Sequence, residues 1–153
     1  MIIERDMVKE VKIAMAADHG GFCLKEILIP FLEEQGYEVD DLGTYNEDPV
    51  DYPVYGKLCG EAVRDKKADL GIVMCGTGIG ISIAANKVKG IRCALCTDEN
   101  MARLARCHND ANMIAMGGRT TDPETAKAIT LAWLTAGCEG GRHQRRIDML
   151  NEM

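Results

Sequence analysis

The chain has 153 residues, of which 46% are hydrophobic and 27% charged, and its formal net charge is −6 at pH 7. This length and balance are typical of one globular domain with its own core. The negative charge excludes a broad electrostatic attraction to nucleic acid or anionic membrane, so an anionic ligand would need a local cluster of positive charge. No apolar run approaches the roughly 18 residues of a membrane span, and the charged start MIIERDMVKE lacks the pattern of a secretory signal.

Apolar runs alternate with helically spaced apolar residues along the chain. The predicted strands are residues 11–18, 37–43, 69–76, 91–97 and 112–118. The predicted helices are residues 24–36, 53–66, 79–88, 98–107, 122–135 and a C-terminal segment, 140–150. Asp122 and Pro123 suit an N-cap and a first helical position, whereas Pro30 interrupts the first helix and predicts a kink there.

This alternation predicts an α/β fold with a five-stranded parallel sheet that helices cover on both faces. Because no linker or repeat divides the chain, residues 11–153 are predicted to form a single domain, preceded by a short extension, residues 1–10. Ligands of such sheets bind beyond the carboxyl ends of the strands. That rule selects the segments DHGG, CGTG, CTDEN and GGR as the candidate site.

The segment CGTGIG places three glycines between a strand and a helix. Free amides at such a helix start bind anions. The dinucleotide fingerprint G-x-G-x-x-G is nearly matched, with Ile81 in place of its last glycine, and Asp98 lies where a ribose ligand would be expected. The motif follows the third strand rather than the first, so a nucleotide site has only partial support.

Cysteine use is the second feature of the chain. Seven cysteines are scattered along it, an odd number without the spacing of a disulfide framework, which predicts free thiols and a cytoplasmic protein. Cys75 ends a strand before a helix N-terminus, a position that favours a thiolate acting as nucleophile or base. Cys93 and Cys96 form C-x-x-C, but residues three apart on a strand face opposite ways, so we expect two buried thiols rather than a metal or redox site.

Histidines and arginines supply the remaining candidates. His19 and His108 fall at strand or helix ends beside polar residues, and His143 lies in the basic segment GGRHQRR. Arg142 and Arg146 share one helix face at i, i+4 spacing, and two guanidinium groups on one face suit a phosphate.

Five segments together resemble ribose-5-phosphate isomerase type B and its wider family of sugar-phosphate isomerases. They are AADHGGFCLKE, DYPVYG, GIVMCGTGIGISIAANKVKGIRCAL, HNDANMIAMGGR and EGGRHQRR. The resemblance covers nearly the whole chain from Val11 onward. It implies a Rossmann-like three-layer α/β/α sandwich and a homodimer with active sites shared between subunits, and whether the dimers pair into a tetramer stays open. It also implies a cofactor-free and metal-free aldose–ketose isomerisation through an enediolate.

The resemblance also assigns site residues. Cys75 matches the base that moves a proton between C1 and C2, His108 the residue that helps open the sugar ring, and Asp18 a group that assists at the opposite hydroxyl. Thr77 lies beside the reacting carbons, and the arginines that bind phosphate come from the partner subunit. The implied catalytic residues are Cys75, His108, Asp18 and Thr77. The implied substrate-binding residues are His19, Gly76, Gly78, Gly80, Ser82, Asn109, Arg119, Arg142 and Arg146.

The substrate is expected to be ribose 5-phosphate, in exchange with ribulose 5-phosphate. Two alternatives stay open: an isomerase for allose 6-phosphate or galactose 6-phosphate, and, in another class, a nucleotide-binding regulator built on GTGIG and Asp98.

Overall fold

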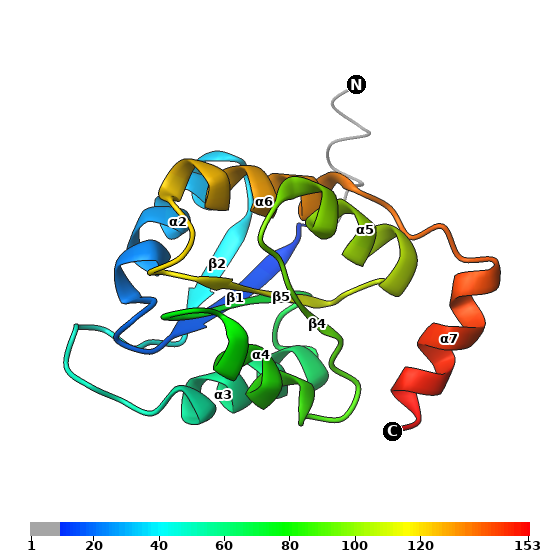
Figure 1. Cartoon of the computed structure of the whole chain (residues 1–153), viewed down its shortest axis with the longest axis horizontal. Coiled ribbons are helices and arrows are strands. Elements are labelled where there is room, and N and C mark those ends of the chain that lie inside the picture. Colours follow the sequence, from blue (N-terminus) through cyan, green and yellow to red (C-terminus); the bar gives the residue numbers. More distant parts are fainter. Residues whose placement is uncertain (1–9) are drawn as a thin grey trace.

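A parallel sheet between two helical layers organises the protein in the computed structural model, which describes residues 10–153 (Figure 1). The strands are β1 (Lys12–Ala17), β2 (Glu38–Asp41), β3 (Leu70–Cys75), β4 (Cys93–Leu95) and β5 (Met113–Gly117). The helices are α2 (Phe22–Glu34), α3 (Tyr52–Arg64), α4 (Ile79–Asn86), α5 (Glu99–Asn109), α6 (Pro123–Thr135) and α7 (Arg142–Asn151). The predicted α/β class, with five strands and a C-terminal helix, is confirmed. The predicted extension falls almost wholly on residues 1–9, outside the described residues.

The strands lie in the order β2-β1-β3-β5-β4, and every neighbouring pair is parallel. The chain moves outward from β1 to β2 and then crosses to β3 on the other side of β1, so the strand order reverses between β1 and β3. Open α/β sheets bind ligands beyond the carboxyl ends of the strands at such a point. This topology directs attention to the segments that follow β1 and β3.

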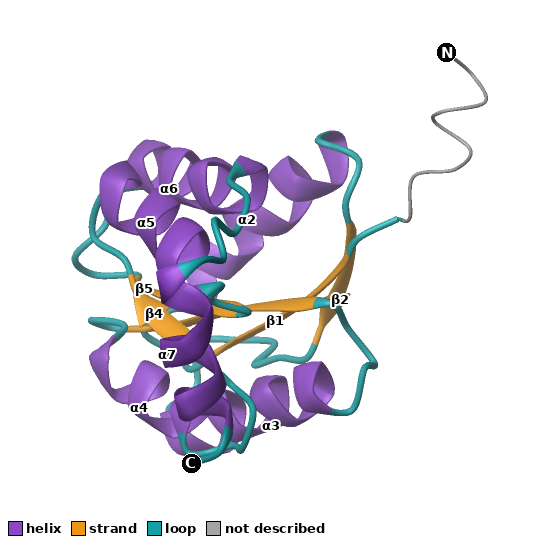
Figure 2. Ribbon diagram, turned by 90° about the vertical axis from the view of Figure 1, so that its right-hand side faces the viewer, coloured by secondary structure: helices purple, strands orange, loops and turns teal. Residues whose placement is uncertain are grey.

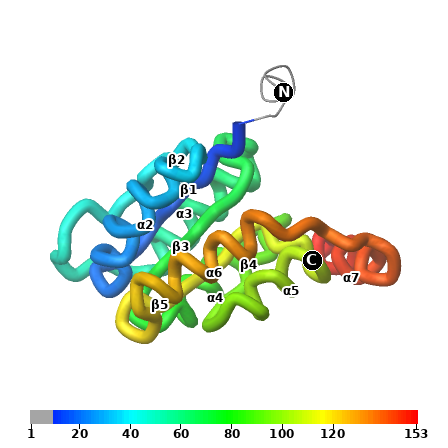
Figure 3. Tube along the Cα trace, turned by 90° about the horizontal axis from the view of Figure 1, so that it is seen from above, coloured from blue at the N-terminus to red at the C-terminus, as the bar shows by residue number. Residues whose placement is uncertain are grey.

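Alternating side chains of the strands form two cores, one on each face of the sheet. Ile13 and Met15 of β1 pack with α2, α5 and α6 around the buried Trp133, whereas Ala14 and Ala16 pack with α3 and α4. Figure 2 shows these layers edge-on, with α2, α5 and α6 on one face and α3 and α4 on the other. The predicted three-layer, Rossmann-like sandwich is therefore confirmed. α7 belongs to neither layer and lies near the end of α5, at the β4 side of the molecule (Figure 3).

Local sequence signals account for most helix ends. Asp122 accepts a hydrogen bond from Thr125 N at the start of α6, as predicted, and Gly36 takes a φ of +96° just beyond α2. Pro30 lies inside α2, which continues through it to Glu34. At β4 the strand is shorter than predicted, three residues instead of seven, because this edge strand pairs on one side alone.

The C-x-x-C segment behaves as expected. Cys93 belongs to the core beneath α3 and α4, and Cys96 to the core on the opposite face. Burial raises the pKa of Cys96 to about 12 and that of Cys93 well above its ordinary value. The two thiols are structural. Within residues 10–153 no helix combines the length and apolar character needed to cross a membrane.

Candidate active site

Asp18 and Cys75 lie side by side at the carboxyl edge of the sheet. Ala17 of β1 pairs with Met74 of β3, and the amide of Asp18 donates a hydrogen bond to the Met74 carbonyl oxygen (3.2 Å). Both residues line an open pocket of about 450 Å³ with Tyr52, Gly76, Thr77, Ile79, Gly80 and Ile83. The pocket therefore occupies the place that the strand order selects.

The sulfur of Cys75 faces the start of α4. Cys75 is 5% exposed, and the amide of Gly78 donates a hydrogen bond to its Sγ (3.2 Å). Gly78 is the N-cap of α4 with a φ of +80°, a conformation that side chains rarely adopt. An amide donor at a helix N-terminus is the contact that stabilises negative charge on a sulfur atom.

Several amides of this turn remain available to a ligand. Ile79 N donates to Thr77 Oγ1 (3.2 Å), but among the described residues the amides of Thr77, Gly80 and Ile81 make no hydrogen bond. Unpartnered amides at a helix start form an anion site. Ser82 differs, because its amide donates to the Gly78 carbonyl and its hydroxyl to the Ile79 carbonyl. Ser82 thus stabilises the start of α4 through these two hydrogen bonds.

Hydrogen bonds to the backbone hold two polar side chains, Asp18 and His19, in the turn after β1. Asp18 Oδ1 accepts hydrogen bonds from the amides of Gly20 (2.8 Å) and Gly21 (3.2 Å), which hold its carboxylate in place. His19 Nδ1 accepts a hydrogen bond from Val50 N (3.2 Å). Since a neutral imidazole has one donor nitrogen and one acceptor, Nε2 carries the proton and can donate to an anion.

Arg119 follows β5 at the same edge. Its amide donates to the Gly76 carbonyl oxygen (3.0 Å), and a Cβ at Gly76 would lie 3.1 Å from its guanidinium Nη1. Gly118 packs still more tightly, since a Cβ there would lie 2.3 Å from the Gly20 carbonyl oxygen. The turns after β1, β3 and β5 are therefore in direct contact. They form one closely packed unit, which includes the positive charge of Arg119.

The other predicted residues lie at the opposite edge of the sheet. α5 starts beyond the carboxyl end of β4 and runs back to the start of β5, so His108 and Asn109, in its last turn, lie at the amino edge. Arg142 and Arg146 lie on α7, which contacts α5. β3 has six residues, so the two edges are about 17 Å apart. Within one chain, the structure does not bring His108, Asn109, Arg142 or Arg146 to Cys75.

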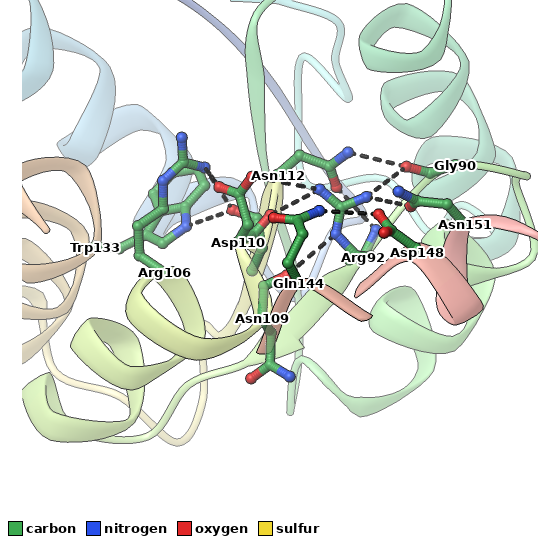
Figure 4. A network of polar contacts seen from close by, with 11 residues as sticks. Gly90, Arg92, Arg106, Asn109, Asp110, Asn112, Trp133, Gln144, Asp148 and Asn151 are labelled. Carbon is green, nitrogen blue, oxygen red and sulfur yellow. Dashed lines mark hydrogen bonds and ion pairs between the residues drawn. The ribbon is translucent and has the colours of Figure 1, made fainter. Parts of the chain in front are cut away.

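A polar network around Arg92 joins the end of α5 to α7 (Figure 4). The guanidinium of Arg92 donates to the carbonyl oxygens of Asn109 (3.1 Å) and Asp110 (2.8 Å) and to Asn151 Oδ1 of α7. Asp110 closes α5 in the left-handed region, with a φ of +44°. The side chain of Asn109 points away from the network in Figure 4.

His108 is paired with a second histidine. Its ring stacks on that of His143, with 4.2 Å between centroids and 12° between planes. Glu139 lies beside both rings, 3.7 Å from His108 Nε2 and 3.8 Å from His143 Nε2. Desolvation lowers the pKa of His143, and the positive charges of His108 and Arg142 lower it further.

Comparison with known proteins identifies the family. The model of the Ribose/Galactose Isomerase family matches residues 13–150. The chain is 48% identical to ribose-5-phosphate isomerase B of Escherichia coli over 139 residues, which cover 91% of this chain and 93% of that protein. This protein belongs to the ribose/galactose isomerase family.

Solved structures of family members agree with this assignment. Ribose-5-phosphate isomerase B of Clostridium thermocellum superposes with a TM-score of 0.92 at 50% identity, covering 93% of this chain and 96% of that one. The Mycoplasma genitalium enzyme, solved with bound ribulose 5-phosphate, has a TM-score of 0.89 at 40% identity and covers 95% and 97% of the two chains. The family fold thus extends over nearly the whole chain.

Sequence reasoning missed Tyr52, Ile79 and Ile83 in the pocket and Glu139 at the opposite edge of the sheet. Tyr52 packs its ring against the backbone of Gly80, where a Cβ would lie 2.5 Å from the ring. Glu139 joins the two histidines. The motif DYPVYG pointed to Tyr52 without a role, and no local signal marks Glu139, because both contacts depend on tertiary structure. Asp98, which was considered as a ribose ligand, instead caps α5 by accepting from Met101 N (2.8 Å).

Proposed function

We propose that this protein interconverts ribose 5-phosphate and ribulose 5-phosphate through an enediolate, with Cys75 as the base. Its family membership and its high identity to enzymes named ribose-5-phosphate isomerase B support the reaction. The observation that carries the mechanism is the hydrogen bond from Gly78 N to Cys75 Sγ inside a pocket with unpartnered amides.

The chemistry follows from this arrangement. The Cys75 thiolate removes the proton from C2 of the open-chain aldose, and the electron pair moves to the carbonyl oxygen at C1. The free amides of Thr77 and Gly80 are placed to donate to that developing oxyanion, and one such donor is typically worth about 3 kcal/mol. The protonated Cys75 then returns the proton to C1, while the hydroxyl proton on O2 moves to O1 and leaves a carbonyl at C2; Asp18 takes part in this exchange between the two oxygens.

The phosphate is proposed to bind to cations from both edges of the sheet. His19 Nε2 and Arg119 approach from the carboxyl edge, and Arg142 and Arg146 approach from the amino edge of another chain. A phosphate held away from the reacting carbons orients the sugar without blocking the base. His108 would then open the sugar ring, with Asn109 beside it.

This arrangement requires a homodimer with shared active sites. The separation of about 17 Å between the edges means that His108 can reach Cys75 only from a second subunit. Around the pocket, Tyr52, Ile79 and Ile83 are 40%, 53% and 56% exposed. An apolar rim of this kind favours burial against a partner chain. We also propose a cytoplasmic location, which the free cysteines among the described residues support.

The test is an assay with the purified full chain. Ribose 5-phosphate should be converted to ribulose 5-phosphate, and Cys75→Ala should lower kcat at least about 1,000-fold, in line with loss of an essential base. Cys138→Ala, at an exposed thiol, is the matched control. Faster turnover of allose 6-phosphate or galactose 6-phosphate would move the substrate assignment to six-carbon sugars. Full activity of Cys75→Ala would disprove the proposed base.

A further inference from the structure

His108, Glu139 and His143 form a compact cluster of side chains that can bind metal ions. They come from the last turn of α5, the loop before α7 and the first turn of α7. One nitrogen from each imidazole and one carboxylate oxygen all lie within 4.8 Å of one another. The reaction proposed above needs no metal, so this convergence of donors has no use in it.

We propose that His108, Glu139 and His143 together bind one divalent transition-metal ion of the Zn²⁺, Co²⁺ or Ni²⁺ class. Two imidazoles and one carboxylate are a donor set that these ions prefer, whereas Mg²⁺ and Ca²⁺ prefer oxygen ligands. Three protein ligands leave a fourth position open to water.

To bind one ion, the three side chains must rotate toward one another. Tetrahedral ligands at 2.0–2.2 Å from an ion are about 3.3–3.6 Å apart. His108 Nε2 lies 3.7 Å from Glu139 Oε2 and His143 Nε2 lies 3.8 Å from Glu139 Oε1, so each imidazole is close to this range from one carboxylate oxygen. The side chains of His108 and Glu139 are 35% and 55% exposed, so an ion can enter and the side chains can turn toward it.

The backbone of the cluster is already fixed. Glu139 N donates to the Cys107 carbonyl oxygen (2.9 Å), and His143 N donates to the Gly140 carbonyl oxygen (3.0 Å), which hold the loop against the end of α5. The ring stacking brings the two imidazoles together, and because an imidazole binds an ion in its ring plane, the two rings must tilt out of the stack to share one ion. The nearby arginines Arg142 and Arg146 repel a cation, so we expect weaker binding than at a closed structural zinc site.

Metal binding has a predicted consequence, which rests on the proposed function. An ion held by His108 occupies the nitrogen needed for ring opening. The metal would therefore inhibit isomerisation of the cyclic sugar phosphate, and a chelator would restore activity.

The first experiment measures binding without reference to activity. Co²⁺ is titrated into the full chain, and its visible absorption and stoichiometry are recorded. We expect one ion per chain, and affinity at least about tenfold lower in His143→Gln and Glu139→Gln, since loss of a mere outer partner of a metal site costs 10–100-fold. Matched controls are His19→Gln and Glu124→Gln, which lie outside the cluster and should bind Co²⁺ like the unaltered chain.

The second experiment measures inhibition by the same ion, each variant being compared with its own metal-free rate. His143→Gln should need at least about ten times more Co²⁺ for half-inhibition. Equal Co²⁺ binding by the unaltered chain, His143→Gln and Glu139→Gln would overturn the site, as would absorption bands of thiolate ligation that disappear in Cys75→Ala. If the variants lose binding but the unaltered chain is not inhibited when loaded, the metal site stands and the proposed role of His108 is wrong.

Discussion

The two edges of the sheet carry the two halves of the proposed active site, and they are built differently. At the carboxyl edge, Asp18 and Cys75 are 6% and 5% exposed and lie on turns that touch through glycine backbone. At the amino edge, Arg142 and Arg146 are exposed on α7, whose buried residue is Ile147. Proton transfer at carbon demands sub-ångström placement, whereas phosphate binding tolerates longer side chains on a less embedded helix. The comparison is consistent with the proposal that the base, Cys75, lies in the rigid half.

The largest expected effect comes from separating the two halves between subunits. Cys75→Ala and Arg146→Ala chains should each show little activity alone. In a mixed dimer, one site combines the intact Cys75 of one chain with the intact Arg146 of the other. After random exchange, half of the dimers are mixed, so the mixture should recover about a quarter of the full activity. The assay is turnover before and after remixing.

Subunit exchange must be checked independently in that experiment, for example with tagged chains. Recovery should be absent when two Cys75→Ala preparations are mixed, which is the matched control. If tagged subunits exchange and the activity of the mixed sample stays at the sum of its parts, the two halves lie in one chain and the shared site is excluded.

The rigid half can be tested by adding one methyl group. Gly118→Ala would place a Cβ 2.3 Å from the Gly20 carbonyl oxygen, so the turns after β1 and β5 must move apart. Overpacking of this kind costs typically about 1–3 kcal/mol in the free energy of unfolding, and we expect kcat to fall with it. Gly137→Ala, where nothing lies within 4 Å of the added Cβ, should stay within about 0.5 kcal/mol in urea unfolding. Equal stabilities would contradict the contact.

The contrast also shows how much the sequence alone can predict. The alternation of strands and helices was predictable. So were the positions of Asp18, Cys75 and Arg119 at or just beyond the carboxyl ends of strands, because the apolar runs mark where the strands end. The separation of His108 from Cys75 was implicit in the predicted elements, since HND lies between the helix at 98–107 and the strand at 112–118 and therefore at the amino edge. The resemblance assigned both residues to one site without this distinction. The contacts of Glu139 and Tyr52 were not predictable, because they depend on elements that meet only after folding.

A smaller effect is expected at the anchor of α7. Ile147 is 3% exposed, and Ile147→Ala should weaken the docking of the helix that carries both arginines. We expect a loss of about 2 kcal/mol, the low end for a buried isoleucine, because the site is shallow. KM for the sugar phosphate should rise more than kcat falls, since proton transfer stays in the other half. Leu150→Ala, at a residue 43% exposed on the same helix, is the control, and an unchanged KM in Ile147→Ala would show that α7 is held by other contacts.

The smallest effect concerns two exposed thiols, one at each edge. Cys23 lies at the start of α2, and its thiol donates a hydrogen bond to Glu47 Oε1 (3.0 Å), which raises the pKa of Cys23. Cys138 lies in the loop before α7. Since the thiolate is the reactive form, a raised pKa means less thiolate at pH 8 and slower alkylation. Iodoacetamide labelling followed by mass spectrometry should therefore modify Cys138 before Cys23.

Glu47→Gln separates this cause from accessibility, because it removes the carboxylate charge while leaving Cys23 exposed. It should speed labelling of Cys23 and leave Cys138 unchanged. Cys59 is a reference for full protection, since burial raises its pKa to about 12, which leaves roughly one thiolate in ten thousand at pH 8. If Cys23 reacts at the same rate with and without Glu47, then local charge does not control its reactivity. The difference between the thiols at the two edges would then reflect access alone.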